Sequence, residues 1–315
     1  MDISRRKLIL VAGVLAGSVT FPLSSLVLAK RNSLQRYEWS GIVLGAEASI
    51  SIYHYDKDRA RDIINRSVLE ITRLEKIFSL YNEDSDLSRL NKDGVLYNPK
   101  TELLNLINLS RYYGAMTCGR FDITVQPLWE FFNANRDQLA TVDTSSAREL
   151  VDYKMISADP HQIRFAKNGM KITLNGIAQG YITDRIIHLL MADNLKAVMV
   201  NLGELRSIGS HDAEILNPNR SNIKINLKDK AIATSGGYGM KFDKKFSHII
   251  DPMMETDSNI DYTSVSVIAD SATIADALST AFYLMPLSDI KDVLQKLNSS
   301  TEVIIIDNNG KVIKV

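Results

Sequence analysis

The chain has 315 residues, its 37 Lys and Arg side chains balance 37 Asp and Glu, and 45% of its residues are hydrophobic. This apolar content, with only 16 Gly, excludes collagen-like and disordered chains, and the length is enough to bury a large core. The single cysteine, Cys118, excludes an internal disulfide and a cysteine-based zinc site, and the neutral charge gives no general electrostatic reason to bind nucleic acid.

Residues 1–29 have the pattern of a secretory signal peptide. Arg5, Arg6 and Lys7 precede an apolar stretch, and Val27-Leu28-Ala29 predicts cleavage after Ala29. The string at residues 4–8 also fits a twin-arginine signal, which directs the export of folded proteins. We therefore expect an exported, periplasmic protein whose single domain spans residues 30–315; the alternative is an uncleaved signal that tethers it to the inner membrane.

The first half of this domain begins with one strand and a long amphipathic helix. Alternation over residues 50–53 predicts a strand, and apolar residues at helical spacing predict a core-facing helix over 60–78. A polar turn at 79–85 ends this helix, a second helix is expected at 100–113, and a turn at Gly119 opens the segment 116–129. Residues 136–167 are consistent with a helix and a hairpin.

The second half predicts several short strands and three helices. Residues 171–181 predict a short strand that leads into a helix, and the strand expected at 197–201 makes the stretch βαβ-like. Strands are expected at 223–227, 231–234 and 264–269, helices at 271–284 and 288–297, and a hairpin at 302–315 with the turn Asn308-Asn309-Gly310. With no internal repeat, the elements predict one compact, mixed α+β unit with two lobes at most.

Oxygen-bearing side chains gather on the helix predicted at 271–284. Asp276 and Thr280 are four residues apart and share one face, and Ser279 lies beside them. Carboxylate and hydroxyl oxygens suit magnesium or calcium. The alternative is that Asp276 caps the helix or forms a salt bridge and that Thr280 is an ordinary helix residue.

Small residues mark the predicted helix start at 175–180. Gly176 and Gly180 permit close approach to the backbone, and amides at a helix start bind phosphate well. The alternative is that the glycines only permit a turn and tight packing. The segment lacks the G-x-G-x-x-G spacing of a dinucleotide fingerprint.

Two further side chains are candidates from their own chemistry. His248, in a short apolar run ended by Asp251-Pro252, is a candidate general base or phosphate contact, or else an interior histidine. Tyr81, just after the long helix, is suited to stack on a planar ring, or else it covers the edge of the core.

Taken in order, these segments resemble the FAD:protein FMN transferases, ApbE-like flavin transferases once called thiamine-biosynthesis lipoproteins. The resemblance covers residues 40–286, nearly the whole predicted domain. It rests on six segments: Phe78-Ser79-x-Tyr81-x-x-x-Ser85-x-Leu87-x-x-Leu90-Asn91, Gly119-x-Phe121-Asp122-x-Thr124-Val125-x-Pro127-Leu128, Gly176-Ile177-Ala178-x-Gly180-Tyr181-x-x-Asp184, Thr234-Ser235-Gly236, His248-Ile249-Ile250-Asp251-Pro252 and Asp276-Ala277-Leu278-Ser279-Thr280-Ala281.

The resemblance implies a two-lobed α+β fold related to the T-fold and a specific reaction. Members of this family bind FAD with magnesium and transfer the FMN half, through its phosphate, to a Thr or Ser of an acceptor redox protein, with release of AMP. Displacement at phosphorus needs charge neutralisation and an aligned nucleophile, and a hydroxyl nucleophile needs a nearby base.

The resemblance also implies roles for individual residues. The metal would be held by Asp276, Thr280, Ser279 and the backbone carbonyl of Gly176. His248 would be the base for the acceptor hydroxyl. Tyr81 would stack on the isoalloxazine, and the remaining flavin or FAD contacts would be Leu44, Arg120, Phe121, Asp122, Thr173, Gln179 and Ile250.

The chain departs from the family pattern at several positions. Leu44 replaces a Met and keeps an apolar contact, whereas Thr173 replaces a carboxylate that the family uses at FAD, and Gln179 replaces a Lys or an acidic residue. The metal-binding residues are retained, so we expect a working, divergent enzyme. The alternatives are an FAD pyrophosphatase, which would release FMN and AMP, and a non-catalytic FAD-binding accessory protein of a redox complex.

Overall fold

A computed structural model of the chain describes residues 33–136, 142–238, 247–253, 262–297 and 300–315. The predicted signal peptide, residues 1–29, lies outside the described residues. Among the helices of the described part, none is long and apolar enough to cross a membrane.

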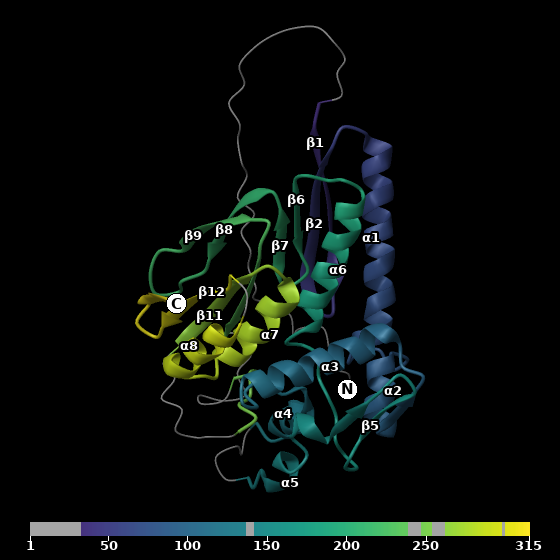
Figure 1. Ribbon diagram of the computed structural model, residues 1–315, viewed down its shortest axis with the longest axis vertical. Coiled ribbons are helices and arrows are strands. Elements are labelled where there is room, and N and C mark those ends of the chain that lie inside the picture. Colours follow the sequence, from purple (N-terminus) through teal and green to yellow (C-terminus); the bar gives the residue numbers. More distant parts are fainter. Residues whose placement is uncertain (1–32, 137–141, 239–246, 254–261, 298–299) are drawn as a thin grey trace, which may run out of the picture.

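An eight-stranded antiparallel sheet organises the larger lobe (Figure 1). Its strand order is β1-β2-β6-β7-β10-β11-β12-β13. The strands are β1 (Gln35–Val43), β2 (Ala46–His54), β6 (Val198–Asn201), β7 (Leu205–Ile208), β10 (Ala231–Gly236), β11 (Tyr262–Ala269), β12 (Glu302–Asp307) and β13 (Val312–Lys314). The expected strands at 50–53, 197–201, 231–234 and 264–269 and the C-terminal hairpin are confirmed.

Helices cover one face of this sheet and a short ribbon covers the other. The helices are α1 (Lys57–Phe78), α6 (Ala178–Ala192), α7 (Ala272–Phe282) and α8 (Leu287–Lys296), and α1 and α6 lie side by side (Figure 1). The ribbon is formed by β8 (Ser210–Ile215) and β9 (Ile223–Lys228), and its apolar residues pack against a second, smaller core. The second face is therefore buried where the ribbon covers β7, β10, β11 and β12, whereas exposed residues alternate along β1.

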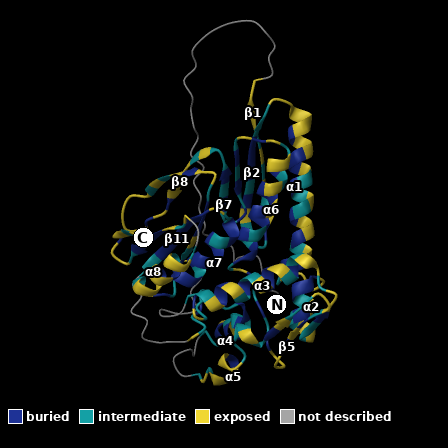
Figure 2. Cartoon of the chain, in the orientation of Figure 1, coloured by how far each residue is buried: buried dark blue, intermediate teal, exposed yellow. Residues whose placement is uncertain are grey.

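The long helix α1 forms where the apolar periodicity predicts it. The carboxylate of Asp56 caps its first turn by accepting hydrogen bonds from the N–H groups of Asp58 and Arg59, at 2.8 and 3.0 Å. Buried side chains recur along one side and exposed ones along the other (Figure 2). The helix ends at Phe78, where the chain turns toward the second lobe.

The second lobe is mostly helical and includes a small sheet. Its elements are α2 (Asp86–Asp93), α3 (Thr101–Met116), the 3-10 turns η1 (Ile123–Val125) and η2 (Tyr153–Met155), α4 (Gln126–Ala134), α5 (Ser145–Arg148), and β3 (Val95–Tyr97), β4 (Ile156–Ala158) and β5 (Gln162–Phe165), paired in the order β3-β5-β4. The two lobes confirm the expected mixed α+β architecture.

Two predictions about residues 171–201 are wrong. Residues 171–175 form no strand, because the Asn91 side chain, rather than a neighbouring strand, pairs with the backbone of Ile172, with both hydrogen bonds at 2.8 Å. The stretch is not βαβ-like either: β6 pairs antiparallel with β2 and β7, strands from distant and following parts of the chain. The helix start at Ala178 is as expected.

Candidate active site

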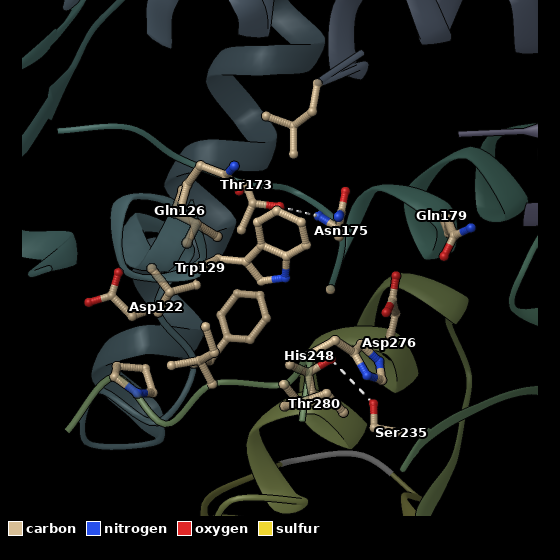
Figure 3. Close-up of a pocket in the computed structure, with 18 of the residues that line it drawn as sticks. Asp122, Gln126, Trp129, Thr173, Asn175, Gln179, Ser235, His248, Asp276 and Thr280 are labelled. Atoms are coloured by element: carbon tan, nitrogen blue, oxygen red, sulfur yellow. Dashed lines mark hydrogen bonds between the residues drawn. The ribbon is translucent and has the colours of Figure 1, made fainter. Parts of the chain in front are cut away.

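A cavity of about 910 Å³ lies where the two lobes meet. Side chains from α2, η1 and α4 line it on one side, and side chains from α6, β10 and α7 line it on the other (Figure 3). Residues of the segment 248–252 complete the lining. Of the predicted site residues, the cavity brings together Tyr81, Arg120, Phe121, Asp122, Thr173, Gly176, Gln179, His248, Ile250, Asp276 and Thr280.

Asp276 and Thr280 reach the cavity from consecutive turns of α7. Ser271 caps this helix by accepting a hydrogen bond from the Ile274 N–H, and the four-residue spacing places both oxygen-bearing side chains on one face. Asp276 is only 3% exposed, and its Oδ2 accepts a hydrogen bond of 3.0 Å from the N–H of Gly180 on α6. The carboxylate is thus fixed by the neighbouring helix.

The backbone of Gly176 lies directly against Thr280. A methyl group at Gly176 would lie 3.0 Å from Thr280 Oγ1 and 3.2 Å from Thr280 Cγ2, so a larger residue at this position would require the Thr280 side chain to shift. The Asp276 carboxylate and the Thr280 hydroxyl are oxygen donors of the kind that magnesium prefers, and Gly176 belongs to the same cavity lining. The residues present therefore fit the predicted cation.

Ser279 is placed differently from its two neighbours. It is 1% exposed and does not line the cavity. Its hydroxyl donates to the carbonyl of Asp276 at 3.0 Å and lies 3.0 Å from Ser235 Oγ, which in turn lies 3.4 Å from Thr280 Oγ1. In this geometry Ser279 supports the backbone of the site, and its role as a metal ligand stays a prediction.

Glu204 is a second acidic residue beside Asp276 that the sequence reasoning missed. It follows the Gly203 turn between β6 and β7 and lines the same cavity. Burial raises the pKa of both carboxyl groups, that of Asp276 to about 8, and the charge of Asp276 raises the pKa of Glu204 further. The site therefore holds two acids that a cation would stabilise as carboxylates.

Other residues of the cavity were also absent from the predicted set. Trp129 on α4 and Ser235 on β10 face it (Figure 3). Neither residue belongs to a group of ligands with a recognisable spacing. In the sequence, only their position within or next to the segments that carry the resemblance could have indicated them. In the described residues, no three or more His, Cys, Asp and Glu side chains form a metal cluster, so a cation would also need hydroxyl and carbonyl oxygens.

His248 lies on the same side of the cavity as Asp276, Thr280 and Ser235 (Figure 3). The segment that carries it is fastened to the second lobe by an ion pair, in which Arg120 Nη1 lies 2.6 Å from Asp251 Oδ2. Both side chains are 14% exposed. Arg120 thus lines the cavity as one half of a neutral pair.

The predicted flavin contacts fall into two groups. Tyr81 is 73% exposed, so one face of its ring is open to a stacking partner, whereas Phe121 is 3% exposed and packs edge-on against Tyr113. The carboxylate of Asp122 accepts hydrogen bonds from Thr124 and Tyr153 and is directed away from the centre of the cavity (Figure 3). Burial raises the pKa of Asp122 to about 6.

The remaining predicted contacts are also located. Thr173 Oγ1 accepts a hydrogen bond from the Asn175 N–H, and Gln179 packs over Gly203, where a methyl group would lie 2.6 Å from its Cδ. Ile250 is buried at the cavity wall. Leu44 is not part of the lining: it lies in the β1–β2 turn, where its N–H donates to Glu75, and Ala46 reaches the cavity instead.

The two-lobed fold and this cavity define an α+β protein with an oxygen-rich site beside an exposed aromatic ring. Residues 44–305 match the model of the ApbE family, and the chain belongs to that family. The expected family and fold class are thereby confirmed.

Relatives and solved structures agree with this assignment. The chain is 25% identical to the FAD:protein FMN transferase of Treponema pallidum over 81% of its length and 80% of the relative. It is 24% identical to the FAD:protein FMN transferase of Escherichia coli K12, over 85% of this chain and 84% of the relative. Its fold superimposes on the flavin transferase ApbE of Vibrio cholerae with a TM-score of 0.77 at 22% identity, covering 90% of this chain and 97% of that structure. It superimposes on an ApbE protein of Thermotoga maritima with a TM-score of 0.76 at 27% identity, covering 89% of this chain and 97% of that structure.

Proposed function

We propose that the chain is a magnesium-dependent FAD:protein FMN transferase that attaches FMN through a phosphoester bond to a Thr or Ser of an acceptor redox protein. Two relatives are named FAD:protein FMN transferase, and their matches to this chain cover 80% and 84% of their own lengths. The single observation that carries the proposal is the convergence, in one cavity, of Asp276 and Thr280, the Gly176 backbone, His248 and the open ring of Tyr81.

The cation would be held by Asp276, Thr280 and the Gly176 carbonyl, with Glu204 as a second carboxylate nearby. When bound, magnesium neutralises charge on the pyrophosphate oxygens and so favours displacement at phosphorus. Both carboxyl groups must lose their protons for this, which links cation binding to proton release.

His248 would accept the proton from the acceptor hydroxyl. The hydroxyl oxygen forms a new bond to the phosphorus of the FMN half, the bond from that phosphorus to the bridging oxygen breaks, and AMP leaves with that oxygen. The ion pair of Arg120 and Asp251 holds the segment that carries His248 to the helical lobe at the wall of the cavity. Tyr81 would hold the isoalloxazine by stacking on its ring.

The test is a transfer assay with the purified protein, FAD, magnesium and an acceptor peptide that contains Thr or Ser. We expect AMP release and a flavin-fluorescent peptide band on a denaturing gel. Release of free FMN with AMP, without labelled peptide, would instead establish a pyrophosphatase. FAD retention without AMP and without a response to magnesium would establish an accessory protein.

We also propose that the protein is exported to the periplasm and meets its acceptor there. The support is the basic and apolar pattern of residues 1–29, together with a domain that needs no disulfide. Fractionation of cells that express the full chain tests this proposal: the shortened protein should be periplasmic, and Arg5→Lys with Arg6→Lys should retain the precursor in the cytoplasm if the signal is of the twin-arginine type.

A further inference from the structure

Asp184, on α6, is buried at the N-terminus of α7. One carboxylate oxygen accepts hydrogen bonds from the Ser271 hydroxyl at 2.6 Å, the Thr273 N–H at 2.9 Å and the Thr273 hydroxyl at 2.6 Å. The other accepts from the Ala272 N–H at 2.8 Å and pairs with Arg206. A single side chain of α6 therefore accepts hydrogen bonds from two free amides in the first turn of α7, where a negative charge is favourable.

At Gly180, four residues before Asp184, a second hydrogen bond joins the two helices, and here α6 provides the donor and α7 the acceptor. The N–H of Gly180 donates to Oδ2 of Asp276 at 3.0 Å. A methyl group at Gly180 would lie 2.4 Å from the Ala272 carbonyl oxygen and 2.9 Å from the Asp276 Cβ, so the helices touch here at the closest distance that glycine allows. The two helices are thus linked at two successive turns.

The candidate cation ligands are divided between these two helices. Gly176 lies just before the first turn of α6, whereas Asp276 and Thr280 belong to α7. The position of Asp276 and Thr280 relative to Gly176 therefore depends on the axial position of α7 relative to α6. The hydrogen bonds of Asp184 set that placement, because they hold the first turn of α7 to one point on α6.

Arg206 extends this link to the central sheet. It projects from β7, its side chain is 13% exposed, and it forms an ion pair with Asp184. In the turn that precedes β7, the carbonyl of Glu204 accepts a hydrogen bond of 3.3 Å from the hydroxyl of Thr183, the neighbour of Asp184. Asp184 therefore lies where α6, α7 and the turn that carries Glu204 are joined.

We propose that Asp184, together with Arg206, is a positioning residue for the cation site: it holds Asp276 and Thr280 at the distance from Gly176 that a divalent cation requires. The inference rests on the proposed function in so far as the cation occupies these ligands. Residues that orient metal ligands typically contribute about 10- to 100-fold to metal affinity.

The test is Mg²⁺ binding to the purified full chain, measured by titration calorimetry well below the unfolding temperature of each variant. In Asp184→Asn and in Arg206→Gln we expect the dissociation constant for Mg²⁺ to rise about 10- to 100-fold. The two substitutions change the net charge in opposite directions. A purely long-range charge effect would weaken binding in the first and strengthen it in the second, and that result would overturn the proposal.

Asp193→Asn is the matched control. Asp193 caps the other end of α6, its side chain is 8% exposed, and it pairs with Arg59 and Arg66 of α1 at 2.7 Å, away from the cavity. Its loss should lower the unfolding temperature and leave Mg²⁺ affinity unchanged. An equal weakening in all three variants, or unchanged affinity in Asp184→Asn and Arg206→Gln, would overturn the positioning role.

A milder variant covers the case in which Asp184→Asn does not fold. Thr273→Val removes one hydrogen bond to Asp184 with little change of shape, and it should weaken Mg²⁺ binding about 2- to 10-fold. Unchanged affinity in this variant would count against the proposal. Absence of Mg²⁺ binding by the wild-type protein, or wild-type affinity in Asp276→Asn, would contradict the proposed cation site itself.

Discussion

Arg120 and Asp251 are 131 positions apart in the chain and form an ion pair of 2.6 Å at the edge of the cavity. Through this pair, the helical lobe holds the segment that carries His248 and Ile250. Both side chains are only 14% exposed, so solvent and salt screen this pair less than an exposed one. An exposed pair would contribute little.

The first prediction concerns this pair. Asp251→Asn and Arg120→Gln should each lower kcat for FMN transfer at least about 10-fold, because each removes the contact that holds the His248 segment to the helical lobe. The double variant should be no worse than the more impaired single variant, since the two side chains act as one unit. Strictly additive losses in steady-state assays would contradict the coupling.

The second prediction concerns pH. Burial raises the pKa of Asp276 from 3.8 to about 8, so the folded protein holds a proton that the unfolded chain releases at lower pH. The stabilising contribution of this group is therefore lost as pH rises through about 8. In EDTA, the unfolding temperature should fall between about pH 6.5 and about pH 8.5.

Magnesium should reverse that trend, because it binds the deprotonated carboxylate. The increase in unfolding temperature on adding Mg²⁺ should be larger at about pH 8.5 than at about pH 6.5, as measured by scanning fluorimetry. The Asp122 carboxyl, whose pKa is raised to about 6, titrates below this range. Asp276→Asn should abolish the Mg²⁺ effect at both pH values; a retained effect would assign the cation to other ligands.

The third prediction separates the hydroxyl of Thr280 from its shape. Thr280→Val keeps the branched side chain beside Gly176 but removes the oxygen, and it should weaken Mg²⁺ binding and lower kcat at least about 10-fold. Thr280→Ser keeps the oxygen and should retain most of both. Calorimetry and AMP release measure the two effects, and equal behaviour of the two variants would exclude Thr280 as a ligand.

The fourth prediction concerns Tyr81. Because this side chain is 73% exposed, its replacement should leave the unfolding temperature nearly unchanged. Tyr81→Ala should raise the dissociation constant for FAD about 2- to 10-fold through loss of ring stacking, whereas Tyr81→Phe should bind as the wild type does. Quenching of flavin fluorescence measures both. Weak binding by Tyr81→Phe would assign the effect to the phenol oxygen instead.

The sequence by itself determined the elements whose evidence is local. The apolar periodicity of α1, the turn at residues 308–310 and the four-residue spacing of Asp276 and Thr280 each depend on residues close in the chain, so helix and turn geometry alone could predict them. The ordered motifs also identified the family, since the match of residues 44–305 confirms it.

The tertiary structure decided everything that depends on distant partners. Residues 171–175 form no strand because Asn91, eighty-one positions away, pairs with Ile172, and β6 pairs with β2 rather than with a preceding strand of its own segment. Glu204 was missed for the same reason. From the sequence, an acidic residue after a glycine turn is expected at the surface, but the fold places Glu204, half-buried, in the cavity with Asp276. The resulting loss of solvent, which raises the pKa of both groups, is a property of the fold alone.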